Sequence, residues 1–330
     1  MKAVFFGTYP ARELGRAEKA LTTRWRLTQI WDADLTSADA AAALADADAL
    51  VTSVYTKAHP PAPRIRLLQS TSAGVDRIDQ NMMPAGCALT NLYGHEITIA
   101  EYVMASMLDW AIRYRERAST FLADGQWSDK QWFADTGVHG ELYRKTVGIF
   151  GFGRIGREVA RRARAFGMRV VALSTWRSAE PGDDALIDRR YTPAETMAFL
   201  ADVDYLAASA PLVEETRGII GETWLAAMNP SAVLIHVGRG PVVDEAALWN
   251  ALNQKHIRGA SIDVWYKYPK ADGVRVSPSR FPFHTLPNVV MTPHASSRSD
   301  EAIDRRFADV AANLDALAGG TPLRNIVARR

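Results

Sequence analysis

The chain has 330 residues, of which 48% are hydrophobic and 23% are charged, and its formal net charge is +2. This composition is ordinary for a soluble globular protein, and the length favours two domains. The small net charge gives no argument for nucleic-acid binding, and the single cysteine, Cys87, excludes an intramolecular disulfide framework.

The first residues are expected to form a strand rather than a secretory signal peptide, because no charged segment precedes an apolar one there. The sequence contains no run of 18 apolar residues, so we expect no membrane span. The lone cysteine fits a reducing compartment, and we expect the protein to be cytoplasmic.

Short apolar runs alternate with amphipathic stretches over residues 1–95, which is typical of a parallel α/β unit. The expected strands are 3–7, 27–31, 49–54, 67–70 and 88–91, and the expected helices are 11–22 and 37–46. Residues 97–122 then predict one long helix. The irregular segment 123–145 carries Trp127, Trp132 and Phe133, which fit either a core or an oligomer interface.

Strands and helices alternate again from residue 146 to residue 294, and a final helix is expected over 301–317. The six expected strands are 146–150, 169–173, 205–208, 232–236, 259–264 and 289–292. Six parallel strands that start from a glycine motif fit a Rossmann domain. Because this motif lies in the middle of the chain, we expect the substrate domain to precede it.

The motif is GIFGFGRIG at residues 148–156, with Gly151, Gly153 and Gly156 in GxGxxG spacing. An apolar run precedes it and a helical pattern follows, as a dinucleotide site requires. The first glycine makes the tight turn, the second lets the backbone approach a pyrophosphate, and the third lets helix and strand pack closely. Arg154 and Ile155 open the helix beside the phosphates, and the other arginines of the run 154–169 are expected on a solvated face. The alternative is a glycine-rich loop that holds no ligand.

Three later segments carry candidate chemistry. Arg239, between two glycines after an expected strand, presents donors that suit a carboxylate, although a surface turn is the alternative. His294 follows the last expected strand and fits a general acid or base in the same region, although a histidine alone is more often structural. Asp263 ends another strand and fits either an acceptor for a nicotinamide carboxamide or a turn cap.

These segments, together with LLQSTSAGVDRID at 67–79 and IAEYV at 99–103, resemble the D-isomer-specific 2-hydroxyacid dehydrogenases, and the likeness covers nearly the whole chain in order. The resemblance implies a Rossmann dinucleotide-binding domain (97–294) inserted in a flavodoxin-like α/β substrate domain (1–96 and 295–330). It also implies a homodimer, with residues 97–145 as the dimerisation extension.

The same resemblance implies the roles of the site residues. Ser72, Gly74 and Val75 would help to hold the substrate carboxylate, Arg239 would bind it, and His294 would donate the proton. The expected cofactor-binding residues are Gly151, Gly153, Arg154, Ile155, Gly156, Ser174, Arg177, Pro211, Thr216, Val237 and Asp263.

One departure from the family concerns the partner of His294. The family usually places a glutamate before the proline that follows Asp263, whereas this chain has Tyr268 there. A carboxylate raises a histidine's pKa by favouring the imidazolium, and a neutral phenol supplies little of that effect. We therefore expect Tyr268 to orient His294, whose acid form is lost at a lower pH than in glutamate-bearing relatives. Smaller departures are His236 and Ser209, for which the sequence suggests no role.

A second departure concerns the cofactor. NAD-specific Rossmann domains place an acidic residue about 20 residues after the glycines, on the ribose 2′-hydroxyl. Ser174 stands there in this chain, and Arg177 with the Ser174 and Thr175 hydroxyls could bind a 2′-phosphate. We expect NADP(H) to be favoured, with NAD(H) use and a solvent-facing arginine as the alternative.

The expected reaction is therefore the NAD(P)H-dependent reduction of a small 2-keto acid to a D-2-hydroxy acid, without a metal ion. Two alternatives stay open at this point. One is a formate-type dehydrogenase, and the other is a non-catalytic cofactor-sensing protein that resembles the corepressors of this fold, because a fold alone does not fix function.

Overall fold

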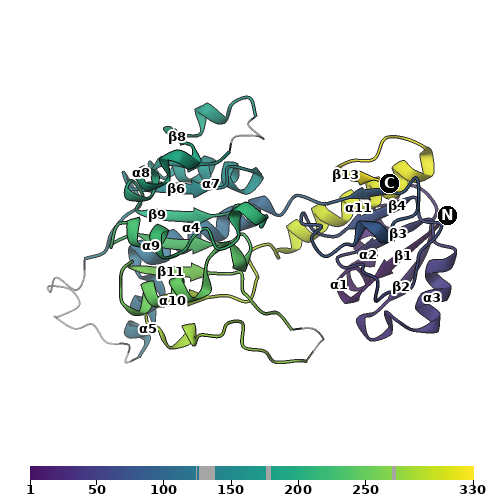
Figure 1. The fold of residues 1–330 in the computed structure, drawn as a ribbon, viewed down its shortest axis with the longest axis horizontal. Coiled ribbons are helices and arrows are strands. Elements are labelled where there is room, and N and C mark those ends of the chain that lie inside the picture. Colours follow the sequence, from purple (N-terminus) through teal and green to yellow (C-terminus); the bar gives the residue numbers. More distant parts are fainter. Residues whose placement is uncertain (124, 126–137, 176–179, 270–272) are drawn as a thin grey trace. The chain divides into compact units, whose positions relative to one another are not determined.

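The computed structural model describes residues 1–123, 125, 138–175, 180–269 and 273–330, and their contacts divide the chain into two compact units. The first unit consists of residues Met1–His95 and Arg298–Arg330, and the second of Glu96–Ser297. In Figure 1 the first unit is drawn in purple to blue and in yellow, and the second in teal and green. The second unit is thus a continuous segment inserted into the first.

The first unit is built on a six-stranded sheet in the order β13-β5-β4-β3-β1-β2. Strands β1 to β5 pair in parallel and give the spatial order 2-1-3-4-5 of flavodoxin-like folds, while β13 is antiparallel to β5. The elements are β1 (Lys2–Phe6), α1 (Thr8–Arg12), α2 (Leu14–Ala20), β2 (Arg26–Ile30), α3 (Ala38–Ala45), β3 (Ala49–Thr52), β4 (Leu67–Ser70), β5 (Ala88–Thr90), α11 (Asp300–Gly319) and β13 (Ile326–Arg329), with short 3-10 helices at Asp32–Asp34 and Gln80–Met82.

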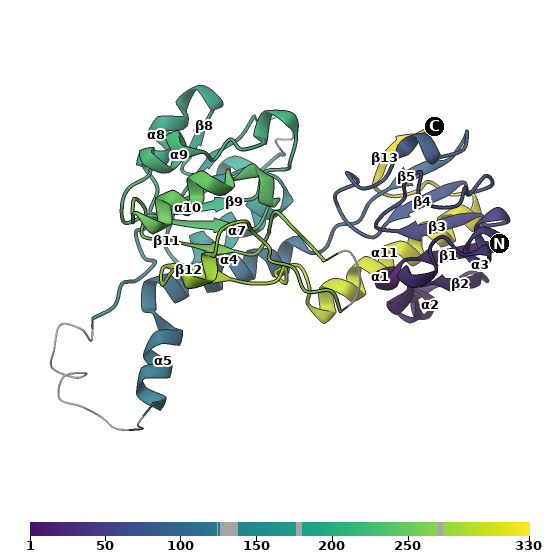
Figure 2. The same cartoon turned by 60° about the horizontal axis from the view of Figure 1, so that its bottom comes forward.

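Helices cover both faces of this sheet. Alternate residues of β1 separate the two cores, since Val4 packs with α3 and Phe5 packs with α2 and α11. Figure 2 shows α3 and α11 on opposite sides of the strands. Because both faces are buried, these strands are continuous apolar runs, as the sequence pattern indicates.

The second unit is built on seven parallel strands in the order β12-β11-β10-β9-β6-β7-β8. Read from β8, this is the Rossmann order 3-2-1-4-5-6 with a seventh strand, so the expected fold class is confirmed. The elements are α4 (Glu96–Ile112), α5 (Tyr114–Leu122), β6 (Thr146–Phe150), α7 (Arg154–Ala165), β7 (Arg169–Leu173), β8 (Arg189–Tyr191), α8 (Thr196–Ala201), β9 (Tyr205–Ala208), α9 (Glu222–Ala227), β10 (Val233–His236), α10 (Glu245–Asn253), β11 (Gly259–Ile262) and β12 (Val289–Met291). Its 3-10 helices are Asp183–Ala185, Pro193–Glu195, Glu214–Thr216, Gly240–Val242 and Phe283–Thr285.

Two cores sandwich this sheet as well. Helices α4 and α7 pack on one face, against residues such as Ile149 and Ile235, and α8, α9 and α10 pack on the other, against residues such as Leu206 and Leu234. This doubly wound arrangement brings the carboxyl ends of all seven strands to one edge, where such sheets bind ligands.

The structure differs from the sequence-based expectations at several elements. The long helix expected over 97–122 is two helices, because Arg113 adopts a left-handed conformation with φ 59° between α4 and α5. The expected helix 11–22 is also two, α1 and α2. Strands β8 and β13 were not expected, so the Rossmann sheet has seven strands rather than six. The aromatic residues Trp127, Trp132 and Phe133 lie outside the described residues.

The division between the two units also differs slightly from the expected boundaries. Residues 295–297 were expected in the first unit, yet they belong to the second. The reason is local, because Asp263 of the second unit accepts hydrogen bonds from the backbone N–H groups of Ala295 and Ser296.

Arg157 is an exception to the expected solvated face of α7. The residue is only 5% exposed, and its guanidinium bonds both carboxylate oxygens of Asp183 at 2.7 and 2.9 Å. Asp183 is itself buried, and its pKa is lowered because the bonds from Arg157 and from the Glu180 N–H outweigh the opposing effect of burial. This pair ties α7 to the segment before β8.

Replacing Asp183 by Ala should lower the free energy of unfolding by about 3–5 kcal/mol, because it leaves a buried guanidinium without its main partner. The matched control is Glu116→Ala, which breaks the exposed Arg113–Glu116 pair and should cost about 0–1 kcal/mol. Chemical denaturation of both variants measures the difference. Equal losses would contradict the role given to the buried pair.

The pH dependence follows from the lowered pKa of Asp183. The stability that this carboxylate contributes is present above its unfolded pKa of about 3.9 and is lost as the pH falls through the lower folded pKa. The difference in the free energy of unfolding between wild type and Asp183→Ala should therefore be largest at neutral pH and should decrease as the pH falls.

Candidate active site

The turn after β6 has the geometry that the glycine motif requires. Gly151 has φ 92°, and a Cβ there would lie 2.5 Å from the Ala210 Cα. A Cβ on Gly156 would lie 2.8 Å from the Gly151 carbonyl oxygen, so this glycine lets α7 pack against the turn. A Cβ on Gly153, in contrast, would meet nothing within 4 Å. Packing therefore requires glycine at positions 151 and 156, whereas Gly153 faces open space.

Gly153 is the N-cap of α7, and no side chain caps that end. The first intrahelical bond runs from the Arg157 N–H to the Gly153 carbonyl, so the preceding N–H groups of the first turn have no intrahelical acceptor. Such a helix start attracts phosphate through these N–H groups and the helix dipole. The residues present thus fit a dinucleotide pyrophosphate at Gly153, Arg154 and Ile155.

The other expected cofactor residues lie along the same sheet edge. Ser174 directly follows β7, where a Rossmann domain places its ribose-binding residue. The Thr216 hydroxyl bonds the Pro211 carbonyl at 2.6 Å and holds the loop after β9, and Val237 is buried after β10. Arg177 lies outside the described residues.

Arg239 is held in a tight loop after β10. A Cβ on Gly240 would lie 2.2 Å from the Trp265 carbonyl oxygen, and one on Gly238 would lie 2.9 Å from the Ala210 carbonyl oxygen, so both flanking residues must be glycines. The half-buried Arg239 donates to the Gly238 carbonyl at 3.0 Å. Its positive charge also acts on the Tyr268 hydroxyl.

His294 and Tyr268 form a hydrogen-bonded pair, with 2.9 Å between the Tyr268 hydroxyl and the His294 Nδ1. The Tyr268 oxygen also accepts the Trp265 N–H at 3.0 Å. Burial of the hydroxyl raises the pKa of Tyr268, against the lowering effects of the Trp265 N–H and of Arg239, so the phenol stays neutral. A neutral Tyr268 can donate to Nδ1 of a neutral His294, or accept from Nδ1 of the imidazolium.

Asp263 organises the loop that carries His294. Its buried carboxylate accepts the Thr292 hydroxyl at 2.5 Å, the Ala295 N–H at 2.8 Å and the Ser296 N–H at 2.9 Å. His294 adopts φ 55°, a left-handed conformation that a histidine takes only where its surroundings hold it. Of the two roles expected for Asp263, these contacts are those of a residue that caps a turn. The other role, as an acceptor for the nicotinamide carboxamide, stays a prediction.

Several supporting residues were not predicted from sequence. The Tyr102 hydroxyl lies 2.7 Å from the Thr292 hydroxyl, and the Trp265 indole donates to the Thr292 carbonyl at 2.8 Å. Both contacts join segments far apart in the chain, so no local pattern could reveal them.

The structure also shows the contacts of Ser209 and His236, the two departures from the family pattern for which the sequence suggested no role. The Ser209 hydroxyl donates to the Gly151 carbonyl at 3.0 Å and ties β9 to the glycine turn. His236 is buried at the end of β10, and this burial lowers its pKa to about 4, so it is a neutral side chain beneath the Arg239 loop.

The expected carboxylate-binding loop follows β4 in the first unit. The Ser72 hydroxyl donates to the Gly74 carbonyl at 2.7 Å, and Asn91 donates to the Ala73 carbonyl at 2.8 Å, so this loop is held through its carbonyls. Among the described residues, none accepts the N–H groups of Gly74 and Val75. Such N–H groups can donate hydrogen bonds to a bound anion.

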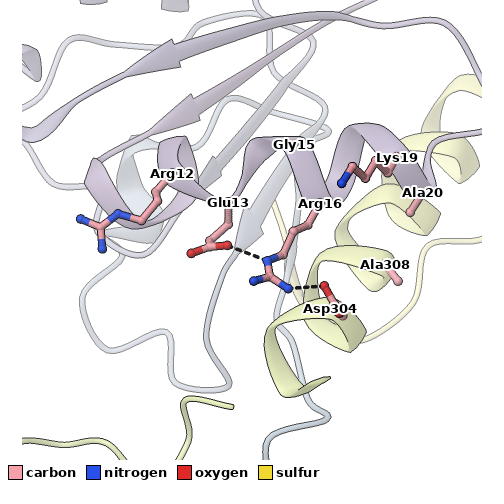
Figure 3. A pocket seen from close by; sticks show the side chains of 8 residues that line it. All are labelled: Arg12, Glu13, Gly15, Arg16, Lys19, Ala20, Asp304 and Ala308. Atoms are coloured by element: carbon pink, nitrogen blue, oxygen red, sulfur yellow. Dashed lines mark hydrogen bonds and ion pairs between the residues drawn. The ribbon is translucent and has the colours of Figure 1, made fainter. Parts of the chain in front are cut away.

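A surface hollow of about 690 Å³ lies elsewhere on the first unit, between α2 and α11 (Figure 3). Arg16 crosses it and bonds Glu13 and Asp304, while Arg12 points away from this pair. The hollow therefore holds paired surface charges. Within the described residues, no group of three His, Cys, Asp or Glu side chains could hold a metal ion, and no helix is long and apolar enough to cross a bilayer.

Comparisons with known proteins agree with this geometry. The family described as D-isomer specific 2-hydroxyacid dehydrogenase, NAD binding domain, matches residues 104–296. The chain is 34% identical over 288 residues to a glyoxylate reductase of Korarchaeum cryptofilum, which covers 86% of this chain and 83% of the relative. It is 37% identical over 277 residues to glyoxylate/hydroxypyruvate reductase B of Pectobacterium carotovorum, which covers 81% of this chain and 80% of the relative.

Among solved structures, the NADPH-dependent glyoxylate/hydroxypyruvate reductase of Sinorhizobium meliloti in complex with NADP and sulfate is similar in fold. Its TM-score is 0.71 at 24% identity, over 99% of this chain and 98% of that one.

The sheet order and the glycine turn are those of a dinucleotide-binding domain, and the family match and the reductase relatives identify an oxidoreductase with an NAD(P)-binding domain. The chain belongs to the family of D-isomer-specific 2-hydroxyacid dehydrogenases.

Substitution by alanine should impair cofactor binding at Gly153 and fold stability at Gly151. Gly153→Ala should leave the melting temperature almost unchanged and weaken NADPH binding at least tenfold, because its methyl group enters only the space that a phosphate would approach. Gly151→Ala should destabilise the fold, because its methyl group meets the Ala210 backbone. Thermal melts and NADPH fluorescence titrations measure both, and unweakened binding by Gly153→Ala would contradict the assignment.

Replacing Tyr268 by Glu should shift the pH profile of turnover upward, because a carboxylate beside Nδ1 favours the imidazolium of His294. The matched control is Tyr268→Phe, which removes the hydroxyl contact without adding a charge and should lower kcat without that upward shift. Initial rates from pH 5 to pH 9 compare the variants. An unmoved profile in Tyr268→Glu would show that residue 268 is not the partner of His294.

Proposed function

We propose that this enzyme reduces a small 2-keto acid such as glyoxylate or hydroxypyruvate to the D-2-hydroxy acid, with Arg239, His294 and Tyr268 as the catalytic residues. One observation carries the proposal. Tyr268 bonds His294, and the positive charge of Arg239 acts on the same phenol, so the hydroxyl links the imidazole to the field of the guanidinium. Relatives named as glyoxylate and hydroxypyruvate reductases support the substrate class.

Binding of the substrate carboxylate falls to two groups. The Arg239 guanidinium presents a planar fork of donors that matches a carboxylate. The N–H groups of Gly74 and Val75 in the first unit, next to Ser72, have no acceptor among the described residues and can donate to an anion. Each of these groups by itself suits the charged end of a keto acid.

The proton comes from His294. The nicotinamide, when bound, supplies the hydride that reduces the keto carbon. As negative charge develops on the keto oxygen, Nε2 of the His294 imidazolium gives it a proton, and the product is the hydroxyl group. Tyr268 keeps the ring in place by accepting a hydrogen bond from the Nδ1–H group, while Asp263 fixes the loop on both sides of the histidine.

For the cofactor, we propose a preference for NADP(H). Ser174 occupies the position after β7 where an acid would repel a 2′-phosphate, and its side chain carries no negative charge. Similar solved structures include complexes with NAD as well as with NADP, so the fold accommodates both.

We also propose a cytoplasmic homodimer in which residues 97–145 contact the partner. Large apolar side chains are exposed in this segment, including Tyr114 at 68% and Tyr143 at 54%. Exposed aromatic groups of this size are typical of subunit interfaces.

The proposal predicts NADPH oxidation when the purified protein meets glyoxylate or hydroxypyruvate, with a D-configured product from hydroxypyruvate. His294→Asn should lower kcat by about 10²–10⁴ without weakening NADPH binding, because it removes only the proton donor. The matched control is His284→Asn, an exposed histidine of the same unit, which should keep full activity. Tight cofactor binding without turnover of any keto acid would contradict the proposal, and equal kcat/KM with NADH and NADPH would contradict the cofactor preference.

A further inference from the structure

Arg306, on α11 of the first unit, is a buried cation without an acidic partner. It is 7% exposed, and it forms no ion pair with any residue that the structure describes. The carboxylate that acts on it electrostatically, Glu13, is bonded to Arg16 at 2.8 Å. Burial of a guanidinium without a counter-charge is costly, so it is seldom retained without a reason.

Arg306 touches the substrate loop directly. Its Nη2 donates to the Thr71 carbonyl at 2.7 Å, one residue before Ser72. Gly74 is the third residue after Thr71, and a chain of three residues spans at most about 11 Å. The guanidinium is therefore bonded to the same short loop that carries the N–H groups of Gly74 and Val75.

Two buried polar atoms in this region lack hydrogen-bond partners among the described residues, namely the Arg306 Nε and the Tyr9 hydroxyl. The two side chains are neighbours, with the guanidinium carbon 5.4 Å from the centre of the Tyr9 ring. Unsatisfied buried groups are rare in folded proteins and often mark functional sites. Here both atoms can donate a hydrogen bond, and one belongs to a cation.

The position of these residues in the sheet supports a ligand site. Tyr9 follows β1 and Thr71 follows β4, and both strands end at the same edge because β1, β3 and β4 are parallel. In the order 2-1-3-4-5 the topological switch point lies between β1 and β3, which is where flavodoxin-like sheets bind ligands. The Ser53 hydroxyl, after β3, bonds the Thr71 hydroxyl and completes this edge.

We propose that Arg306 and Tyr9 form a second anion subsite beside the substrate loop, so that the enzyme prefers 2-keto acids whose other end bears a carboxylate or a phosphate. The inference rests on the proposed function and names its substrate class. The keto-acid carboxylate occupies the N–H groups of Gly74 and Val75, and the second anion bonds the guanidinium and the phenol. Exposed Arg298, whose charge also acts on Arg306, adds positive potential at the same place.

The test compares substrate pairs that differ by one charged group. Oxaloacetate and 2-oxobutyrate differ by a carboxylate in place of a methyl group, and the phosphate ester of hydroxypyruvate differs from hydroxypyruvate by the phosphate. Wild type should favour the charged member of at least one pair by tenfold or more in kcat/KM. The pair with the larger ratio identifies the second anion as carboxylate or phosphate.

Arg306→Met should reduce that ratio at least tenfold, because methionine fills the space without the charge, and the ratio cancels any effect that loss of the Thr71 contact has on both substrates. Tyr9→Phe removes only a hydroxyl and should reduce the ratio about threefold. The matched control is Arg12→Met, which removes an exposed cation of the same unit and should leave the ratio unchanged. Thermal melts of each variant verify folding, and Arg306→Lys, which keeps the charge, should retain part of the preference.

A binding measurement separates this subsite from the reaction itself. Calorimetry compares tartronate with D-lactate, which differ by a carboxylate in place of a methyl group, on the NADPH-loaded protein. Tighter binding of tartronate to wild type than to Arg306→Met supports the subsite even if no keto acid is turned over, in which case only the proposed reaction fails. An equal preference in wild type and in Arg306→Met, in rates or in binding, overturns the subsite.

Discussion

Ala210, the second residue after β9, contacts two loops of the second unit. Gly151 approaches its backbone so closely that a Cβ would lie 2.5 Å away, and a Cβ on Gly238 would lie 2.9 Å from its carbonyl oxygen. The phosphate-binding turn and the Arg239 loop are therefore packed against one point, where the chain order of the sheet reverses. A side chain at either glycine would move both loops relative to the strands, so the spacing between cofactor and carboxylate groups depends on these contacts.

The groups around His294 are positioned mostly by neutral donors rather than by ion pairs. Asp263 is a buried carboxylate, but its acceptors are filled by a hydroxyl and two backbone N–H groups of the loop that it holds. Tyr268 is a neutral phenol held by a backbone N–H, and His236 is kept neutral by burial. Arg239 then provides a positive charge that no adjacent carboxylate cancels among the described contacts, which suits an anionic substrate.

Much of the architecture could be predicted from the sequence, because strands buried on both faces are continuous apolar runs. Strands β4, β6, β7 and β9 have the expected bounds. The edge strand β8, in contrast, has the polar sequence Arg-Arg-Tyr, and no apolar run marks it. Arg113 ends α4 through its backbone conformation, which hydrophobic periodicity does not encode.

The candidate site was predictable where a residue type has a distinctive chemistry, as with the glycine motif and the Gly-Arg-Gly segment. The partners of Asp263 were not, since they lie about 30 residues further along the chain and are set by the pairing of β11 with β12. The burial of Arg306 could not be predicted from the sequence, because an arginine on an amphipathic helix is ordinarily expected to face solvent.

The insertion of one unit within the other has a consequence for synthesis. All strands of the second unit belong to one uninterrupted stretch, so its sheet can assemble once residue 297 has left the ribosome. The first unit must wait, because α11 covers one side of its sheet and β13 pairs with β5 only after residues 300–329 are made. Until then the apolar surface under α11 is exposed on the nascent chain, which makes residues 1–95 the part most in need of chaperone protection.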